Sequence, residues 1–204
     1  TLYLLPGLYE GDLALSRPAA AENAAPIAIR GRGMEPVRLR GSFTLAGVRA
    51  EVRRIVFEGP VRAQSHPGAA AGPGPTVGAS AAPRAPQITF SHCHFGGGPT
   101  CLRTEGLDGL SIEHCVFSNF TAAAVASIGC RNADLRGNGF DNVTAPAVLL
   151  DRPESLLHAG CNGFRRPEHA GLPSVPADSA TGPFGWPFGP HRTERQGGIL
   201  RLVE

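Results

Sequence analysis

The sequence contains no lysine: all 19 basic residues are arginine. This absence removes lysine from every catalytic mechanism considered for the chain. Apolar runs extend over only a few residues, so no segment is long enough to span a membrane as a helix. The formal net charge of +2 by itself argues neither for nor against nucleic acid, and we predict no nucleic-acid partner.

A disulfide framework is also lacking, because the five cysteines are few and odd in number. Buried thiols that pack as small apolar groups are expected instead. No basic stretch followed by an apolar one opens the chain, so we expect a mature chain, a cytosolic one or one excised from something longer. Glycine (27) and proline (19) are too frequent for a helical bundle, and too unevenly spread for a fully disordered chain.

A repeat organises the middle of the chain. Residues 87–95 (QITFSHCHF), 109–117 (GLSIEHCVF) and 132–140 (NADLRGNGF) share one pattern, and a weaker copy covers residues 155–164. Within each copy, apolar residues alternate at period two, break once and alternate again. Period two indicates a strand with one buried face, and the break indicates a corner.

The repeat aligns similar residues in columns. One column, at the corner, contains His92, His114, Gly137 and Gly160. A tight corner often needs a positive φ, which glycine adopts freely and histidine adopts more often than most residues, so this column has a backbone explanation. The other columns are Ile88/Leu110/Ala133/Leu156, Phe90/Ile112/Leu135/His158, Cys93/Cys115/Asn138/Cys161, Phe95/Phe117/Phe140/Phe164 (the last slipped by one), Leu102/Val125/Val148, Thr104/Ser127/Leu150 and Asp108/Arg131/Glu154.

A unit of 22–24 residues with two or three short strands and no helix predicts an all-β fold, a parallel β-helix whose coils bury their inward residues against each other. Residues 1–164 form this β-helix in our interpretation. Residues 59–86, rich in Gly, Pro, Ala and Ser, are expected to be a long insertion loop, and residues 165–204 an irregular Pro/Gly-rich C-terminal cap. Within that cap, residues 198–203 are expected to form a last strand.

Residues 5–13 (LPGLYEGDL) and 25–33 (APIAIRGRG) resemble the first coils of bacterial members of the right-handed parallel β-helix superfamily that includes the pectate lyases. The nearest enzyme relatives by this resemblance are the alginate-lyase and chondroitinase-B-like polysaccharide lyases. It covers residues 1–58 and 87–164, and it implies a right-handed, single-stranded β-helix. It also implies an extracellular or periplasmic location and an acidic polysaccharide as partner.

Lyases of this kind cleave by β-elimination, which needs a cation on the uronate carboxylate and a base for the C5 proton. Without lysine, only Arg, His or Tyr can serve as the base. Arg103, with Glu105 and Asp108 nearby, is the best single candidate for a catalytic residue; the alternative is a surface ion pair. The candidates for substrate binding project outward from strands, where a solvated strand face is the alternative: Arg30, Arg38, Arg40 and Glu105.

We predict no metal site made of protein ligands and no cofactor, with Ca²⁺ only if the chain is a lyase. Calcium needs several converging carboxylates, and the acidic residues Glu113, Asp134 and Asp141 share no column. Asp108 and Glu154 alternate with Arg131, which satisfies them as a charge ladder. Zinc would need His92, His94 and His114 to converge with Cys93 and Cys115, but these cysteines point inward while the histidines occupy the turn.

Two functions remain open. The first is a carbohydrate-associated β-helix that binds or cleaves an acidic polysaccharide, and whether it is an enzyme is left undecided. The alternative is a non-catalytic structural β-helix, used as a spacer, spike, capsid or surface assembly component. It is favoured by the missing lysine and by small apolar residues expected on one outer face, which suggest a homo-oligomer or docking to a larger assembly: Ala122, Ala124, Ala126 and Leu149.

Overall fold

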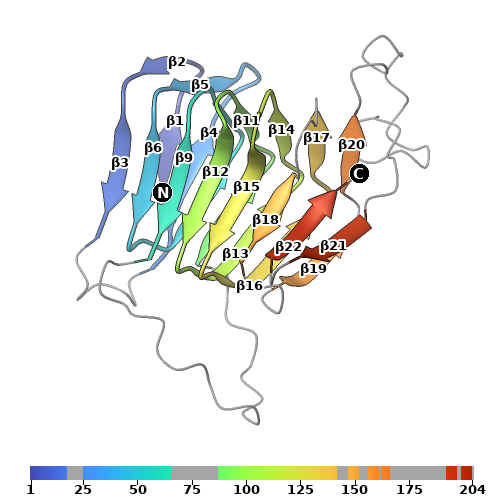
Figure 1. The fold of residues 1–204 in the computed structure, drawn as a ribbon. Helices are drawn as coiled ribbons and strands as arrows, with labels where there is room; N and C mark the ends of the chain where they lie inside the picture. Colours follow the sequence, from blue (N-terminus) through green and yellow to red (C-terminus); the bar gives the residue numbers. More distant parts are fainter. Residues whose placement is uncertain are drawn as a thin grey trace.

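The computed structural model describes residues 1–17, 25–65, 87–141, 147–151, 156–160, 162–165, 192–196 and 199–203. These residues contain no helix, and their strands wind into a right-handed parallel β-helix (Figure 1). The predicted fold class is therefore confirmed. In the part of the chain covered here, no helix is long and apolar enough to cross a membrane.

Each coil contributes one strand to each of three sheets. Sheets A and B have seven strands each, all parallel. Sheet A contains β1 (Leu2–Leu4), β4 (Ile27–Gly31), β7 (Ala50–Arg53), β10 (Ile88–Ser91), β13 (Asp108–Glu113), β16 (Arg131–Arg136) and β19 (Leu156–Gly160). Sheet B contains β2 (Gly7–Glu10), β5 (Val37–Arg40), β8 (Ile55–Phe57), β11 (His94–Gly96), β14 (Val116–Ser118), β17 (Gly139–Asp141) and β20 (Gly163–Arg165).

Sheet C has eight strands, and its last two run antiparallel to their neighbours. Its members are β3 (Leu13–Ser16), β6 (Phe43–Ala46), β9 (Val61–Gln64), β12 (Thr100–Glu105), β15 (Ala123–Ile128), β18 (Val148–Leu150), β22 (Ile199–Val203) and β21 (Arg192–Gln196). The strand expected over residues 198–203 is confirmed as β22. The C-terminal segment is thus not irregular throughout, because β21 and β22 form an antiparallel pair on the edge of β18.

The regular strands of the coil continue past residue 59, where the insertion loop was expected to begin. β9 occupies Val61–Gln64 and pairs with β6 on one side and β12 on the other, and Val61 and Ala63 are buried. Residues 59–65 therefore belong to the coil, because two inward residues alternate in β9 as they do in β6. The rest of the expected insertion, residues 66–86, lies outside the described residues, as does most of the expected cap.

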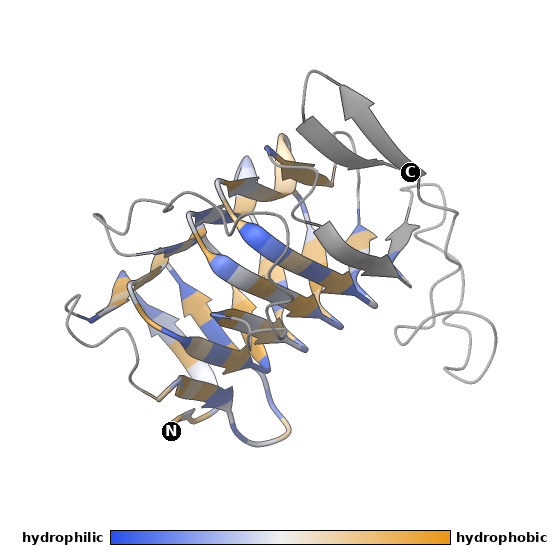
Figure 2. Ribbon diagram, turned by 90° about the horizontal axis from the view of Figure 1, so that it is seen from below, coloured by the Kyte–Doolittle hydropathy of each residue, from blue (hydrophilic) through white to orange (hydrophobic). Residues whose placement is uncertain are grey.

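The core is a tube of stacked inward side chains. The rings of Phe95, Phe117 and Phe140 lie in one file, with centroids 4.7 Å and 5.3 Å apart and planes nearly parallel, and Phe57 continues the file 5.0 Å from Phe95. All four rings are fully buried. Figure 2 shows hydrophobic and hydrophilic residues alternating along the strands, as expected when only one face of each strand is buried.

The predicted columns match the strand registers through the third coil. Ile88 pairs with Leu110 and Leu110 with Ala133, and Val125 joins Leu102 to Val148. Asp108 pairs with Arg131 as expected, while Glu154 lies outside the described residues.

In the fourth coil, Leu156 pairs with Ala133 and Phe164 with Phe140 as expected, but the columns expected between them are wrong by one residue. The register shifts between Ala133 and Asp134, so Asp134 pairs with His158, Leu135 with Ala159 and Arg136 with Gly160. The cause is one extra residue in β19, a β-bulge that moves every later residue along by one position. Asn162 therefore takes the place expected for Cys161, which is itself outside the described residues.

Asn138 and Asn162 form a buried amide ladder at the end of the cysteine column. Asn138 Oδ1 accepts a hydrogen bond from the Cys115 N–H at 3.0 Å, and its Nδ2 donates to Ile112 O at 2.8 Å and to Asn162 Oδ1 at 3.0 Å. The partners expected for a buried asparagine are thus present. The four described cysteines are free and buried, as predicted: Cys93, Cys101, Cys115 and Cys130.

Candidate functional site

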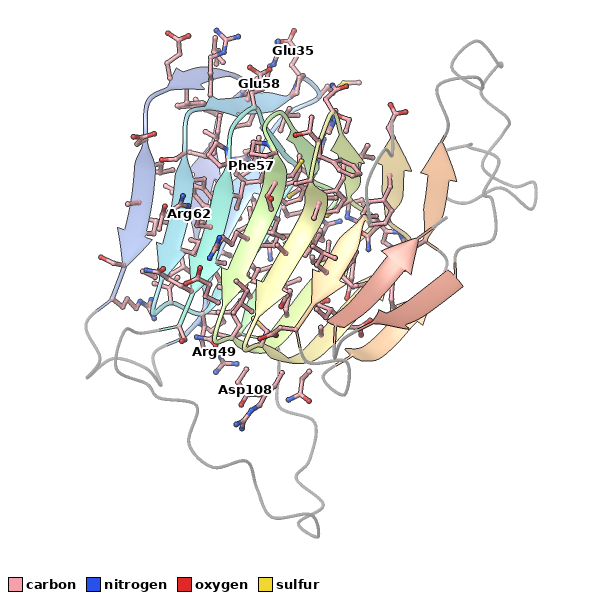
Figure 3. All side chains as sticks on the ribbon, in the orientation of Figure 1. Glu35, Arg49, Phe57, Glu58, Arg62 and Asp108 are labelled. Carbon is pink, nitrogen blue, oxygen red and sulfur yellow. The ribbon has the colours of Figure 1, made fainter. Side chains whose placement is uncertain are left out.

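The structure places the predicted arginines on three different sides of the β-helix. Arg30 lies on sheet A, Arg38 and Arg40 lie on sheet B, and Arg103 lies on sheet C. Figure 3 shows this separation: Glu58, the partner of Arg38 and Arg40, is at one edge of the molecule, while Arg62, the register neighbour of Arg103, is on the face of sheet C. These residues therefore do not line one common groove.

Arg103 and Glu105 are brought together as an ion pair. Arg103 Nε lies 2.6 Å from Glu105 Oε1, and both side chains are about half exposed. An exposed pair of this kind contributes about 0–1 kcal/mol. The third residue expected nearby, Asp108, starts a strand of sheet A and accepts a hydrogen bond from Asn132 Nδ2 at 2.9 Å.

The other predicted arginines also have carboxylate partners. Arg30 Nη2 lies 3.1 Å from Glu51 Oε2. Arg40 is 3.1 Å from Glu58 and 3.0 Å from Glu10, and Arg38 pairs with Glu58 as well. Burial alone would raise the pKa of Glu58, but its hydrogen bonds and ion pairs with the two arginines outweigh this and lower it below the ordinary value. The positive charges of the arginines predicted to bind a polyanion are therefore already neutralised by carboxylates of the protein itself.

The prediction of a strip of small apolar residues on the outer face of β15 is wrong in part. Ala124 is fully buried and belongs to the core, whereas Ala122 is exposed and Ala126 and Leu149 are half-buried neighbours in register. Sequence alternation predicted an outward Ala124, but this residue is buried in the core, and the exposed strip is correspondingly interrupted.

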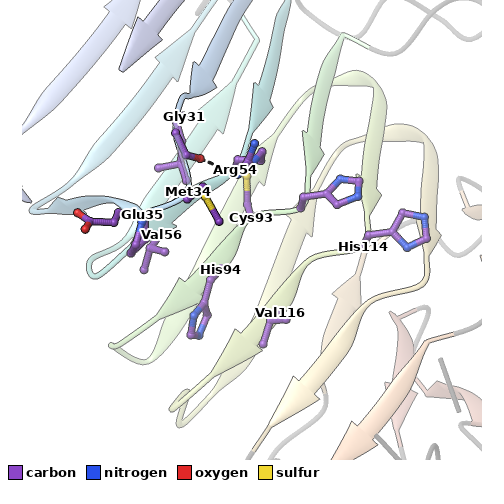
Figure 4. A pocket seen from close by; sticks show the side chains of 13 residues that line it. Gly31, Met34, Glu35, Arg54, Val56, Cys93, His94, His114 and Val116 are labelled. Carbon is purple, nitrogen blue, oxygen red and sulfur yellow. Dashed lines mark hydrogen bonds between the residues drawn. The ribbon is translucent and has the colours of Figure 1, made fainter. Parts of the chain in front are cut away.

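A pocket of about 350 Å³ lies where sheet A turns into sheet B (Figure 4). Its walls come from the segment between β4 and β5, from the corners before β8, β11 and β14, and from the outer row of sheet B. The lining residues are Gly31, Gly33, Met34, Glu35, Pro36, Arg54, Ile55, Val56, His92, Cys93, His94, His114 and Val116.

Backbone conformation builds the edge of this pocket. Arg54, His92 and His114 occupy the corner column and have φ values of 59°, 54° and 52°, and Gly137 continues the column at 62°. The positive φ predicted for this column is confirmed at His92, His114 and Gly137, whereas Gly160, also expected there, pairs with Arg136. Each residue in the left-handed conformation makes a sharp turn of the chain. The side chains of Arg54, His92 and His114 therefore lie at the same corner of successive coils. His92 and His114 have ring centroids 5.3 Å apart.

Val56, His94 and Val116 supply the neighbouring wall. They are register neighbours on β8, β11 and β14, and they share the outward row of sheet B. Figure 4 shows His94 and Val116 projecting to the same side of the sheet from adjacent strands. This row gives the pocket an apolar surface with one imidazole in its middle.

Arg54 contributes a positive charge to the lining of the pocket. Its Nη2 donates to Gly33 O at 2.8 Å, and within the described residues it forms no ion pair. Burial lowers the pKa of His92, with further lowering by Arg53, His114 and Arg54. Burial also lowers the pKa of His94, against the opposing effect of Asp141 and Glu58. Both of these imidazoles are therefore neutral at pH 7, and the lining also contains the charged side chains of Arg54 and Glu35.

Sequence analysis missed Arg54 as a site residue, although its signal was present. Val52, Ile55 and Phe57 match the inward columns, which places Arg54 at the corner beside His92. Among the described residues we find no group of three or more His, Cys, Asp or Glu side chains able to hold a metal ion. His94 and His114 point in different directions (Figure 4).

No family model, curated protein or solved structure matches this chain. The site must therefore be interpreted from its own residues.

Proposed function

We propose that this chain is a carbohydrate-binding parallel β-helix that holds an acidic saccharide in the pocket between sheets A and B. One observation carries the proposal: Arg54 and three imidazoles line the same pocket as the apolar outer-row residues Val56 and Val116. A guanidinium binds a uronate carboxylate with two parallel hydrogen bonds, and the C–H face of a pyranose ring packs on apolar side chains.

The contrast between Arg54 and the other arginines supports this location. Arg30, Arg40 and Arg103 already contact carboxylates at 2.6–3.1 Å, so a polyanion would have to displace those partners. Among the residues that the structure describes, the Arg54 guanidinium donates only to a backbone carbonyl, which leaves most of its donors for a ligand.

Kinship with the pectate-lyase-like superfamily is part of the same proposal, and it places the protein outside the cytoplasm, in an extracellular or periplasmic space with its polysaccharide. We propose binding rather than β-elimination. The predicted catalytic Arg103 is neutralised by Glu105 on another side of the β-helix, and there is no lysine to act as base.

Binding can be tested by titration calorimetry with oligogalacturonate, oligoalginate and chondroitin oligosaccharides, with a maltooligosaccharide as the neutral control. We expect at least one acidic oligomer to bind, and Arg54→Asn to weaken that binding at least tenfold, since asparagine tolerates the positive φ at this corner. Arg103→Gln is the matched control and should bind as the parent does. Absence of binding, or equal affinity of Arg54→Asn, would overturn the proposal. Absorbance of unsaturated ends in the same samples reports cleavage.

A structural role is the second candidate, and the first coil favours it. β1, β2 and β3 each end their sheet in the part of the chain that the structure describes. Five large apolar side chains of this coil are 40–65% exposed: Leu2, Tyr3, Leu5, Leu8 and Tyr9. Unpaired strand edges and exposed apolar groups together favour an interface.

We propose a second copy of the chain as the partner of this coil. A two-fold axis perpendicular to the β-helix axis would bring two first coils together, which is the isologous arrangement of most dimers. Light scattering should then show a dimer that Leu5→Glu and Leu8→Glu convert to a monomer. A parent protein that stays monomeric at high concentration contradicts this candidate.

A further inference from the structure

We propose that Ser118 and His94 form a nucleophile–base pair that hydrolyses O-acyl esters. Ser118 Oγ lies 2.8 Å from His94 Nε2. The two residues lie on adjacent parallel strands, β11 and β14, where Gly96 pairs with Ser118 and His94 with Val116. A hydroxyl within 2.6–3.2 Å of an imidazole nitrogen is the geometry by which such a nucleophile is activated.

His94 has the protonation state that a general base needs. Its partial burial lowers the pKa, so the imidazole is neutral at pH 7 and Nε2 can accept the Ser118 proton. Asp141 and Glu58 act in the opposite direction. Their negative charges stabilise the imidazolium that forms once the proton has moved, which is the electrostatic part of the role an aspartate plays in a catalytic triad.

Three consecutive glycines leave room beside the nucleophile. A Cβ atom at Gly96 would make an ordinary van der Waals contact with Ser118 Oγ, 3.5 Å away, so the glycine leaves room for a methyl-sized group beside this oxygen, whose residue is 8% exposed. Gly97 and Gly98 follow with φ values of 86° and 89°. Their N–H groups form no hydrogen bond with the described residues, and we assign them as donors to the oxyanion.

The reaction balances with water as the only co-reactant. Ser118 Oγ attacks the acyl carbonyl carbon while its proton passes to His94 Nε2. The tetrahedral intermediate then breaks its bond to the alcohol oxygen, which leaves with the proton from His94, and acyl-Ser118 remains. Water attacks this ester and gives a proton to His94; the carboxylic acid leaves as Ser118 regains a proton.

The substrate class follows from the pocket. His94 lines the same pocket as Arg54, and Ser118 lies beside His94 just outside that lining, so we take an O-acyl group on the saccharide bound there as the ester that reacts. This choice of substrate rests on the proposed function, whereas the Ser118–His94 chemistry does not.

The pair can be tested without any saccharide. A fluorophosphonate probe should label Ser118, located by mass spectrometry of the digested protein, and p-nitrophenyl acetate should be hydrolysed with a rate that rises as His94 loses its proton. Ser118→Ala should abolish labelling. His94→Gln, which keeps a hydrogen bond to Ser118 but cannot act as a base, should slow both reactions by roughly 100-fold or more. Ser91→Ala, an outward serine on sheet A, is the matched control and should react as the parent does.

Two results would overturn the inference: no label on Ser118 in the folded parent protein, or equal rates for the parent and His94→Gln. Circular dichroism of each variant separates loss of reactivity from loss of fold. If Arg54→Asn fails to bind saccharide while Ser118 is still labelled, saccharide binding and ester chemistry are shown to be separate properties. If saccharide binds but Ser118 is not labelled, the proposed function stands and this inference fails.

Discussion

The rings of Phe95 and Phe117 lie 4.7 Å apart and within 6° of parallel, one directly above the other in successive coils. Both are fully buried, and the same file continues to Phe57 and Phe140. An inward side chain in this fold packs mainly against its equivalents above and below, so the loss of one ring leaves a gap in the tube that neighbouring coils cannot close.

Phe117 is therefore the most sensitive core position that we can name. We expect Phe117→Ala to lower the free energy of unfolding by about 3–5 kcal/mol, because transfer free energy is lost and a cavity remains. Phe117→Leu keeps most of the volume and should cost less. Urea denaturation followed by circular dichroism measures both. A loss below about 1 kcal/mol for the alanine variant would contradict the stacked file.

The corner column should discriminate between residues by backbone conformation. His92 has a φ of 54°, which asparagine tolerates and β-branched residues do not. We expect His92→Val to destabilise the protein by about 1–3 kcal/mol and His92→Asn to have a much smaller effect. Urea denaturation of the two variants side by side provides the comparison. Equal stability would show that the corner does not require the left-handed conformation.

Asn138 should be important because three of its hydrogen bonds are buried. Replacing it by alanine removes the side-chain hydrogen bonds to the N–H of Cys115 and the carbonyl of Ile112, both fully buried residues. Each such buried group costs about 1–3 kcal/mol. We expect Asn138→Ala to lower the unfolding midpoint in urea, while the surface variant Gln64→Ala leaves it nearly unchanged. Similar midpoints for the two variants would contradict the amide ladder.

Acid should weaken the folded state through the histidines. The pKa values of His92 and His94 are lowered from 6.5, mainly by burial, so the unfolded chain binds more protons than the folded one below that pH. Stability is unaffected by these groups well above pH 6.5 and falls as the pH drops through 6.5 toward the lowered values. Urea midpoints between pH 8 and pH 5 should show this fall, and His94→Gln should reduce it. A midpoint that rises on acidification would contradict the assignment.

The buried thiols should be inert until the protein unfolds. Burial raises the pKa of Cys101 to about 12 and that of Cys115 well above its ordinary value, and only the thiolate is nucleophilic. We expect Ellman's reagent to leave the four buried cysteines unmodified in buffer at pH 8 and to react with them rapidly in 8 M urea. Rapid reaction of Cys101 or Cys115 in buffer would show that the coils open there.

Much of the fold could be read from the sequence, because each inward position depends on local alternation and on the same position one repeat later. The registers of Phe95, Phe117 and Phe140 follow from this rule. It failed where one extra residue enters β19, since a bulge changes no composition and shifts His158 and every later residue by one place. It also failed at Val61–Gln64, where a strand precedes a low-complexity segment and was assigned to it.

The candidate site was much less predictable. Outward residues such as Arg30, Arg40 and Arg103 alternate in the same way whether they are free or paired, and only the structure shows the carboxylates beside them. The pairing of His94 with Ser118 likewise joins two strands and depends on their register and side-chain rotamers.

By itself, the sequence determined the length of the coil, the identity of the buried rows and hence a parallel β-helix, because burial repeats with the chain's own period. Only the tertiary structure decided which corner carries the pocket. Arg54 and His92 lie on either side of residues 66–86 in the sequence yet occupy adjacent coils, so their proximity is set by the register between β7 and β10. Contacts between coils depend on that global register, and no local pattern encodes it.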